Sequence, residues 1–425
     1  MADRNQRRGQ HGQAMVLMVG GVAAMIALLG LIVDGGNIWA QQRVVQNGSD
    51  AAAEAGAVVL AQKLAGASTP ANGWDAQVSA QVQASATANG ITITAAYYTD
   101  ICGIPLTPSG EAALNADGTY DLGAADAVGS GALPATDNTT PNCPSLTVGP
   151  PAGVLVLGQK IIGTYLASVV GLRTVTVSTR ATGVAGWLQG MCDASQGEAC
   201  ATLPVTIPVS PIACSGNGSL QQIAASWQSG QTYAVPLCKN DAGNVGWLDW
   251  NPPSGGTSQL IDSILYPDNP SIDLPSWQYV SQTGNVNSQG VQDAINTYDG
   301  QVVLIPMFDI TCNTQPDTTQ GGTAPDYGCP ASSIGGNGQN QWYRFPWFAA
   351  FKLCDPTNPL CTVGSTTYTQ GAYINGSDGS ICGSAWSGAG CLVGQFVNII
   401  KVGTVGANGG GGTSPTKVVG VQLIK

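Results

Sequence analysis

The catalytic chemistry open to this chain is limited first by its histidine content. The one histidine, His11, lies in the N-terminal tail ahead of a long apolar run. Serine and cysteine nucleophiles are commonly activated by a neighbouring imidazole, and Cys/His zinc sites need the same side chain. If the apolar run crosses a membrane, His11 is separated from the rest of the chain. The sequence also lacks a G-x-x-x-x-G-K-[ST] phosphate loop, so we predict no metal and no cofactor.

Paired carboxylates are a further route to catalysis, through the hydrolysis of glycosidic bonds. Candidates lie in the second half of the chain: Asp249, Asp262, Asp268, Asp273 and Asp309. Aspartate is also a preferred turn residue, and glutamate occurs only at positions 54, 111 and 198. We therefore assign these aspartates to turns and predict that the protein is not an enzyme. A membrane-tethered hydrolase is kept as an alternative.

The cysteines form an even set of twelve, all beyond residue 100 and none in a C-x-x-C pair. On the outer side of a membrane, such a set favours disulfides over free thiols. Twelve cysteines allow on the order of 10⁴ pairings, and the short stretches between neighbours favour local pairs. We predict the pairs Cys102 with Cys143, Cys192 with Cys200, Cys214 with Cys238, Cys312 with Cys329, Cys354 with Cys361, and Cys382 with Cys391.

The charges are few and unevenly distributed. Arg4, Arg7 and Arg8 precede the apolar run, with Asp3 as the one acid beside them, whereas 24 acidic and 11 basic residues follow from Asp34 onward. An acidic chain with dispersed basic residues has no stripe that could displace counterions from nucleic acid. We therefore predict no binding to nucleic acid.

The apolar run, Ala14 to Val33, contains no charged residue. Twenty helical residues at 1.5 Å each span the roughly 30 Å hydrocarbon core of a bilayer. With the arginines before it and Asp34 after it, the positive-inside rule predicts a cytoplasmic N-terminus and an extracytoplasmic remainder. A cleaved signal peptide is the alternative, but its apolar region is usually shorter. Gly20 and Ala24, four apart, could allow close contact with another helix.

The segments after the span predict helices followed by strands. We expect a break at Gly35-Gly36, an Ala-rich helix over 37–65 with a kink at Asn47-Gly48, and a second helix over 74–88. A strand is expected from Ile91, a helical or mixed segment over 154–170, and a strand from Thr174. The glycine run 409–412 is expected to be the tip of a hairpin.

Tryptophans gather in the second half of the chain: Trp247, Trp250, Trp277, Trp342, Trp347 and Trp386. Such rings could form a face that binds a glycan or a protein partner. The alternative, which we favour, is that they fill the core of a loop-rich β domain that is poor in phenylalanine.

The stretch from Arg8 to Ala57 closely resembles the TadE/TadG-like module of tight-adherence (Flp) pilus assembly proteins. The resemblance is carried, in order, by Arg8-Gly9-Gln10, the apolar span, Val33-Asp34-Gly35-Gly36, Arg43, Asn47, and 50–53. It departs from the family pattern in the extra His11-Gly12 and in Gly48-Ser49 after the asparagine. The resemblance implies an envelope component that builds or anchors thin adhesive pili, without a catalytic centre.

These observations predict an α+β protein with a cytoplasmic tail (1–13), a transmembrane helix (14–33), a helical and α/β domain (34–186) and a β-rich, disulfide-stapled ectodomain (187–425). The predicted function is assembly, anchoring or adhesion in a Tad/Flp-type pilus system. Its expected partners are the lipid bilayer and other pilus-assembly membrane proteins or pilins, with a homo-oligomer possible. A pseudopilin processed by a prepilin peptidase is the alternative, although Ala14 or Leu17 replaces the glutamate expected five residues into a mature pilin.

Overall fold

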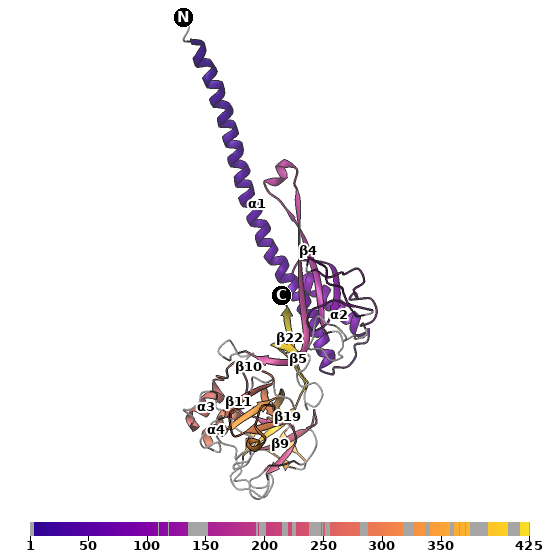
Figure 1. Ribbon diagram of the computed structural model, residues 1–425, viewed down its shortest axis with the longest axis vertical. Helices are drawn as coiled ribbons and strands as arrows, with labels where there is room; N and C mark the ends of the chain where they lie inside the picture. Colours follow the sequence, from indigo (N-terminus) through magenta and orange to yellow (C-terminus); the bar gives the residue numbers. More distant parts are fainter. Residues whose placement is uncertain are drawn as a thin grey trace.

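The computed structural model describes residues 4–108, 110–117, 119–134, 152–192, 194, 201–214, 220–222, 227–237, 248, 250, 256–280, 288–317, 327–335, 341–357, 361–364, 366–369, 371–374, 390–406 and 417–424. A long N-terminal helix leads into a sheet that packs against its C-terminal half, and a second β-rich part lies beyond this sheet (Figure 1). The predicted α+β class with an N-terminal apolar helix is confirmed.

Helix α1 (Arg4–Leu64) is continuous. The predicted break at Gly35-Gly36 is therefore wrong, and the helix runs through Asn47-Gly48 without a new start at Ser49 or Asp50. A glycine inside a helix costs only about 1 kcal/mol relative to alanine, which the packing of neighbouring turns can offset. At Gly48 the missing side chain permits close packing, because a Cβ atom there would lie 3.0 Å from Ile91.

The C-terminal half of α1 buries one face of small and branched side chains. Its buried residues include Val45, Ala52, Ala53, Ala57, Leu60 and Ala61. Spacings of three, four and seven place such residues on the same side of a helix. Helix α2 (Gly73–Ala88) packs against α1 in the same core and confirms the second predicted helix.

The sheet beneath α1 has the strand order β1-β4-β5-β22-β20, and β10 and β21 also pair with β5. Its strands are β1 (Thr92–Thr99), β4 (Gly153–Gly163), β5 (Thr174–Met191), β10 (Ile272–Asp273), β20 (Ile399–Val402), β21 (Thr404–Gly406) and β22 (Val418–Ile424). Strands β1 and β5 confirm the predicted strands. The pair β20 and β22 is parallel, so the hairpin predicted across 409–412 is wrong.

Strand β4 occupies most of the segment that the sequence predicted as helical or mixed. It is hydrogen-bonded to β1 on one side and β5 on the other. The N-terminal half of β4 is buried in this central position, and Val154 and Val156 there are inaccessible to solvent. A short apolar run without clear alternation is compatible with either a buried strand or a helix. Only η1 (Ala167–Val170), a 3₁₀ turn, is helical here among the described residues.

Strand β5 continues from the first sheet into the second part, so the predicted boundary between residues 186 and 187 falls within one strand. On the α1 side of the sheet, β5 crosses very close to the helix. A Cβ atom at Gly183 would lie 2.6 Å from the carbonyl oxygen of Ala53 and 2.9 Å from the nitrogen of Glu54. Glycine is therefore required where the strand meets the helix backbone.

The second part is built around a sheet in the order β18-β19-β15-β12-β6, with β9 also paired to β19. Its strands are β6 (Ile207–Pro208), β9 (Thr232–Leu237), β12 (Val302–Phe308), β15 (Trp347–Leu353), β18 (Tyr373–Ile374) and β19 (Gly390–Phe396). A smaller sheet contains β11 (Ser276–Val280), β14 (Gln341–Phe345) and β13 (Ile310–Cys312). Helices α3 (Thr257–Leu265) and α4 (Gln289–Asn296) share an apolar core with the strands of the larger sheet.

The remaining elements are short. They are β2 (Leu106–Thr107) with β3 (Gly110–Glu111), β7 (Ile212–Cys214) with β8 (Leu220–Gln222), β16 (Thr362–Val363) with β17 (Thr366–Thr367), and the 3₁₀ turn η4 (Ala331–Ser333). Segments of this length cannot supply much apolar burial by themselves, so covalent links are a useful source of stability.

Disulfides join Cys312 to Cys329 and Cys354 to Cys361, as the local pairing predicted. Cys102, Cys192 and Cys391 are also disulfide-bonded. The cysteines predicted as their partners, at positions 143, 200 and 382, lie outside the described residues, as does position 238, the predicted partner of Cys214. These four pairings stay predictions.

Candidate functional site

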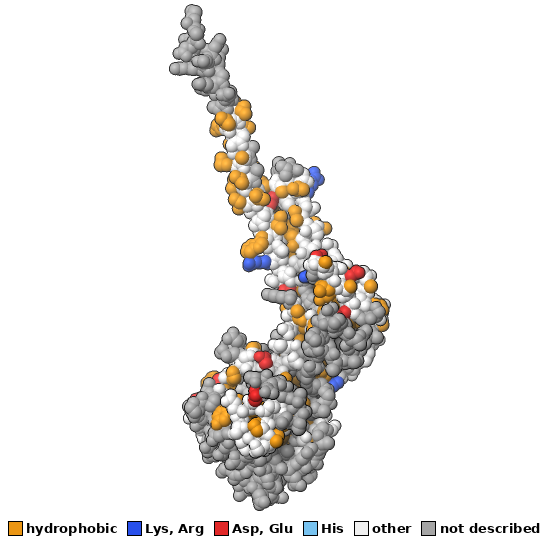
Figure 2. Space-filling view, viewed as in Figure 1, with side chains coloured by type: hydrophobic (Ala, Val, Ile, Leu, Met, Phe, Trp, Pro, Cys, Tyr) orange, Lys and Arg blue, Asp and Glu red, His pale blue; other side chains and the backbone are white. Residues whose placement is uncertain are grey.

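The N-terminal half of α1 carries apolar side chains that no other described part of the chain covers (Figure 2). The exposed large apolar residues run from Met15 to Val33. Burying one such side chain is worth about 1.5–3 kcal/mol, so a fully hydrated helix of this kind is very unfavourable. By length and composition, the helix is a candidate membrane span, in agreement with the predicted transmembrane segment.

Gly20 and Ala24 lie within this exposed stretch. A Cβ atom at Gly20 would have no neighbour within 4 Å. The two positions are therefore open to another helix, and their predicted role in helix contacts stays a prediction. Arg4, Arg7 and Arg8 lie in the first turns of α1, but their side chains are outside those that the structure describes.

The carboxylate of Asp34 accepts hydrogen bonds from backbone N–H groups in the loop that joins β4 to β5. Its Oδ1 accepts a 2.7 Å hydrogen bond from the backbone N–H of Tyr165, and its Oδ2 accepts bonds of 3.0 Å and 2.6 Å from Leu166 and Ala167. The N–H groups of Ala167, Tyr165 and Leu166 hold the pKa of this carboxyl below its ordinary value. We predicted Asp34 only as a charge that orients the span, and the sequence analysis missed this contact.

A second contact between the hairpin tip and α1 lies one turn closer to the N-terminus. Gly30 faces Leu166, and a Cβ atom at Gly30 would lie 3.1 Å from Cβ of Leu166. The hairpin therefore touches α1 at the end of the apolar stretch and not only beyond it. The signal for this loop in the sequence is an uncharged run, 161–172, between Lys160 and Arg173. Most of this run belongs to the segment 154–170, which we predicted as helical or mixed.

Beyond Asp34, the contacts between α1 and the sheet are polar as well as apolar. The hydroxyl groups of Ser49 and Thr179 lie 2.7 Å apart, and the side chain of Gln46 donates to the carbonyl of Arg180. On the exposed side, the guanidinium of Arg43 stacks over Trp39, with Cζ 4.1 Å from the ring centroid. Arg43, one of the residues that carry the family resemblance, is thus placed next to an exposed aromatic ring.

The aspartates considered for catalysis are distributed over different elements. Asp262 lies in α3, and Asp273 lies in β10 opposite Gly190. Asp309 lies between β12 and β13, where it forms an ion pair with Arg344. Burial raises the pKa of Asp309, while the charge of Arg344 opposes that shift. Asp309 is therefore more than a turn residue, while Asp249 lies outside the described residues.

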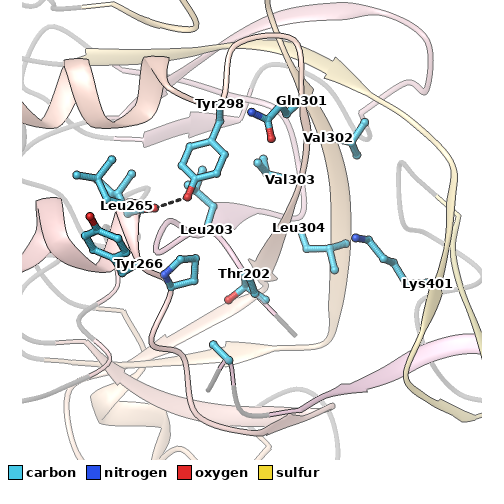
Figure 3. A pocket seen from close by; sticks show the side chains of 14 residues that line it. Thr202, Leu203, Leu265, Tyr266, Tyr298, Gln301, Val302, Val303, Leu304 and Lys401 are labelled. Atoms are coloured by element: carbon cyan, nitrogen blue, oxygen red, sulfur yellow. Dashed lines mark hydrogen bonds between the residues drawn. The ribbon is translucent and has the colours of Figure 1, made fainter. Parts of the chain in front are cut away.

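The second part contains an open cleft of about 820 Å³ (Figure 3). Its lining includes Leu203, Tyr266, Tyr298, Gln301 and Lys401, with no acidic side chain among the described lining residues. The hydroxyl of Tyr298 donates a 2.6 Å hydrogen bond to the carbonyl of Ile264. The described lining therefore contains no carboxylate pair for hydrolysis. Among the described residues, no group of three or more potential metal ligands is found either.

Of the tryptophans considered for a binding face, Trp250, Trp277, Trp342 and Trp347 are half-buried and take part in packing. Trp342 lies 5.5 Å from Tyr279 between ring centroids, and the Trp277 indole donates to the carbonyl of Tyr327. Trp250 and Trp347 pack against a buried cluster around Tyr343. This placement supports a core role, while Trp247 and Trp386 lie outside the described residues.

A buried aspartate, Asp100, lies beside the half-buried Glu111 in the first part. Asp100 accepts backbone hydrogen bonds of 2.9 Å from Cys102 and 2.7 Å from Ile104. Burial and the adjacent Glu111 raise the pKa of Asp100 to about 7, although these backbone donors oppose the shift. The acids lie at the turn after β1, and nothing in the sequence indicates that they would meet.

Comparison with known protein families gives a match at the N-terminal end of the chain. Residues 12–59 match the family model described as Flp pilus-assembly TadE/G-like. No curated protein and no solved structure matches the chain. The match covers the apolar half of α1, Asp34, Arg43 and most of the face that packs on the sheet. Residues 12–59 are therefore a TadE/TadG-like segment, as the resemblance predicted.

Proposed function

We propose that this chain is a structural, non-enzymatic component of a Tad/Flp-type pilus system, anchored in the cytoplasmic membrane by α1 with its N-terminus in the cytoplasm. Its ectodomain would assemble, anchor or present the pilus at the cell surface through other pilus-assembly membrane proteins or pilins. The TadE/G-like match at 12–59 supports a role in a pilus system. The described lining of the cleft, which carries no acidic side chain, and the ion-paired Asp309 give no support to the alternative of a tethered hydrolase.

The observation that carries this proposal is the continuity of α1. At 1.5 Å per residue, its 61 residues form a rod about 90 Å long. One half is apolar and uncovered by the described chain, and the other half is part of the core of a sheet. A load applied to the ectodomain would therefore reach the membrane through helix backbone and not through a flexible linker, which suits an anchor.

The orientation can be tested with epitope tags on the full chain. Protease added to intact spheroplasts should digest a tag placed after Lys425 and spare a tag placed before Met1. Changing Arg4, Arg7 and Arg8 to glutamate removes the charge bias and should lower the fraction of chains in this orientation. Protection of the C-terminal tag in the unmodified chain would contradict the proposal.

A pseudopilin built into the filament is a second candidate, because the uncovered half of α1 could equally pack against the helices of other subunits. Gly20 and Ala24 would allow such close packing. Intact-mass measurement of the protein extracted from membranes separates the two. The anchor should have its full-length mass, whereas a processed pilin should lack the residues up to Gly9 or Gly12.

A further inference from the structure

The tip of the β4–β5 hairpin, residues 161–173, lies beside the membrane end of α1. We propose that this tip is a second membrane-contacting element, which enters the phospholipid interface of the bilayer that α1 crosses. The inference rests on the membrane anchoring proposed above and adds a lipid-binding site to it. In Figure 1 the hairpin extends along α1 away from the sheet.

The composition of the hairpin tip is that of an interfacial segment. The twelve residues from Ile161 to Leu172 carry no charge. This is unusual for an exposed hairpin, because both of its strands would ordinarily face water. Ile161 and Tyr165 are each 67% exposed, and Leu172 is 62% exposed. Apolar side chains gathered at one exposed tip commonly mark an interaction surface.

The contact between Gly30 and Leu166 sets the height of the tip. Gly30 lies four residues before Asp34, which is about 6 Å along the helix axis, and therefore within the uncharged stretch. If that stretch crosses the hydrocarbon core, Leu166 lies at the level of its outer edge. At this level the exposed side chains of the tip would face lipid, because the described chain covers α1 there on one side only, through Leu166.

Several backbone N–H groups of the tip are hydrogen-bonded within the protein, which suits a medium with little water. Unpaired N–H groups are costly at membrane depth. Asp34 accepts the N–H groups of Tyr165, Leu166 and Ala167. The N–H groups of Thr164 and Leu172 are bonded to the carbonyls of Arg173 and Ala167, at 3.1 Å and 3.0 Å. These five backbone donors of the loop are thus satisfied within the protein.

The charges that flank the tip favour lipid over a second copy of the chain. Lys160 and Arg173 bracket the uncharged run, and basic side chains with long apolar stems place their charges at lipid phosphates. Tyr165 has the amphipathic ring that is enriched at membrane interfaces. Two tips facing each other in a dimer would instead bring these like charges together.

The test is depth-dependent quenching in liposomes of phosphatidylcholine and phosphatidylglycerol that contain the full chain. A small fluorescent amino acid is incorporated at one position at a time: Leu172 in the tip, Leu114 as an equally apolar and exposed control elsewhere, and Ile26 in the span. Lipids brominated near the headgroup should quench the probe at position 172 more than lipids brominated near the chain end. The probe at position 114 should not respond.

The outcomes separate this proposal from the membrane anchor itself. Quenching at position 26 without quenching at position 172 would overturn the lipid contact and leave the anchor intact, whereas no quenching at either position would overturn the anchor. If the probe at position 172 becomes shielded from solvent as protein density rises, and brominated lipid does not quench it, the tip contacts a second copy of the chain. That result would contradict the proposal. Asp34→Ala, which releases the tip, should reduce quenching at position 172 and leave position 26 unchanged.

Discussion

The hydroxyl of Tyr98 donates a 2.6 Å hydrogen bond to Oδ1 of Asp75, and both side chains are buried. The same carboxylate accepts the backbone N–H groups of Gly129 and Gly131, at 2.8 Å and 2.7 Å. One side chain at the start of α2 thus holds β1 and the loop over 129–131 in place.

Asp75→Ala should lower the free energy of unfolding by about 3 kcal/mol, because it leaves the buried Tyr98 hydroxyl and two partly buried backbone N–H groups without their acceptor. Tyr98→Phe should cost only about 1 kcal/mol, since Asp75 keeps its two backbone donors. Denaturant unfolding of the detergent-solubilised chain measures both. Equal losses in the two variants would show that Asp75 acts only through Tyr98.

Gly183→Ala should destabilise the packing of α1 on the sheet. The added methyl group would meet the backbone of Ala53 and Glu54, which cannot rotate away, and overpacking of this kind costs about 1–3 kcal/mol. The matched control is Gly163→Ala in the neighbouring strand, where a Cβ atom has no neighbour within 4 Å. Thermal unfolding should separate the variants, and an equal melting temperature would contradict the close approach.

The acids Asp100 and Glu111 predict a pH dependence of stability. Because the pKa of Asp100 is raised in the folded state to about 7, the folded chain binds this proton more tightly than the unfolded chain. Stability from this source is complete below the ordinary aspartate pKa near 4 and is lost as the pH rises towards about 7. Asp100→Asn should flatten the unfolding free energy across this window. An unchanged slope would assign the dependence to other groups.

Removing the Cys312–Cys329 disulfide with alanine at both positions should destabilise the second part. The bond closes a loop with a sequence separation of 17, for which chain entropy gives about 3 kcal/mol. The effect should be local, so hydrogen exchange should increase around β13 and β14 while β4 and β5 stay protected. The Cys354–Cys361 pair closes a shorter loop and should contribute slightly less. Equal loss of protection in β5 would contradict a local role.

The sequence predicted the elements whose signals are local. The apolar span, helix α2 and the alternating strand from Thr174 follow from length, propensity and periodicity within one segment. Two of the local disulfide pairs follow from the same proximity along the chain. The glycines at 35–36 misled the prediction because glycine preference is weak compared with the packing of a long helix.

The relationships that define the site are remote in sequence and were not predictable from it. Asp34 accepts hydrogen bonds from three residues that lie between 131 and 133 positions further along the chain. Nothing in the sequence around Asp34 indicates this role as an acceptor. The run over 154–159 lacks a period that distinguishes a strand from a helix, and its strand state is fixed by β1 and β5, which flank it. Pairing of this kind is decided by the whole chain.

Strand β22 has a consequence for the order in which the protein can mature. It pairs with β5 through Val419 to Ile424 and lies at the very end of the chain, close to α1 in Figure 1. In a chain that inserts by its N-terminal helix, α1 is in the bilayer long before this strand has been synthesised and exported. A product that ends early would remain anchored but carry an open sheet edge against its helix, with exposed backbone groups that favour misassociation. The sheet against α1 can therefore close only after the second part has been synthesised, because that part lies between β5 and β22 in the chain.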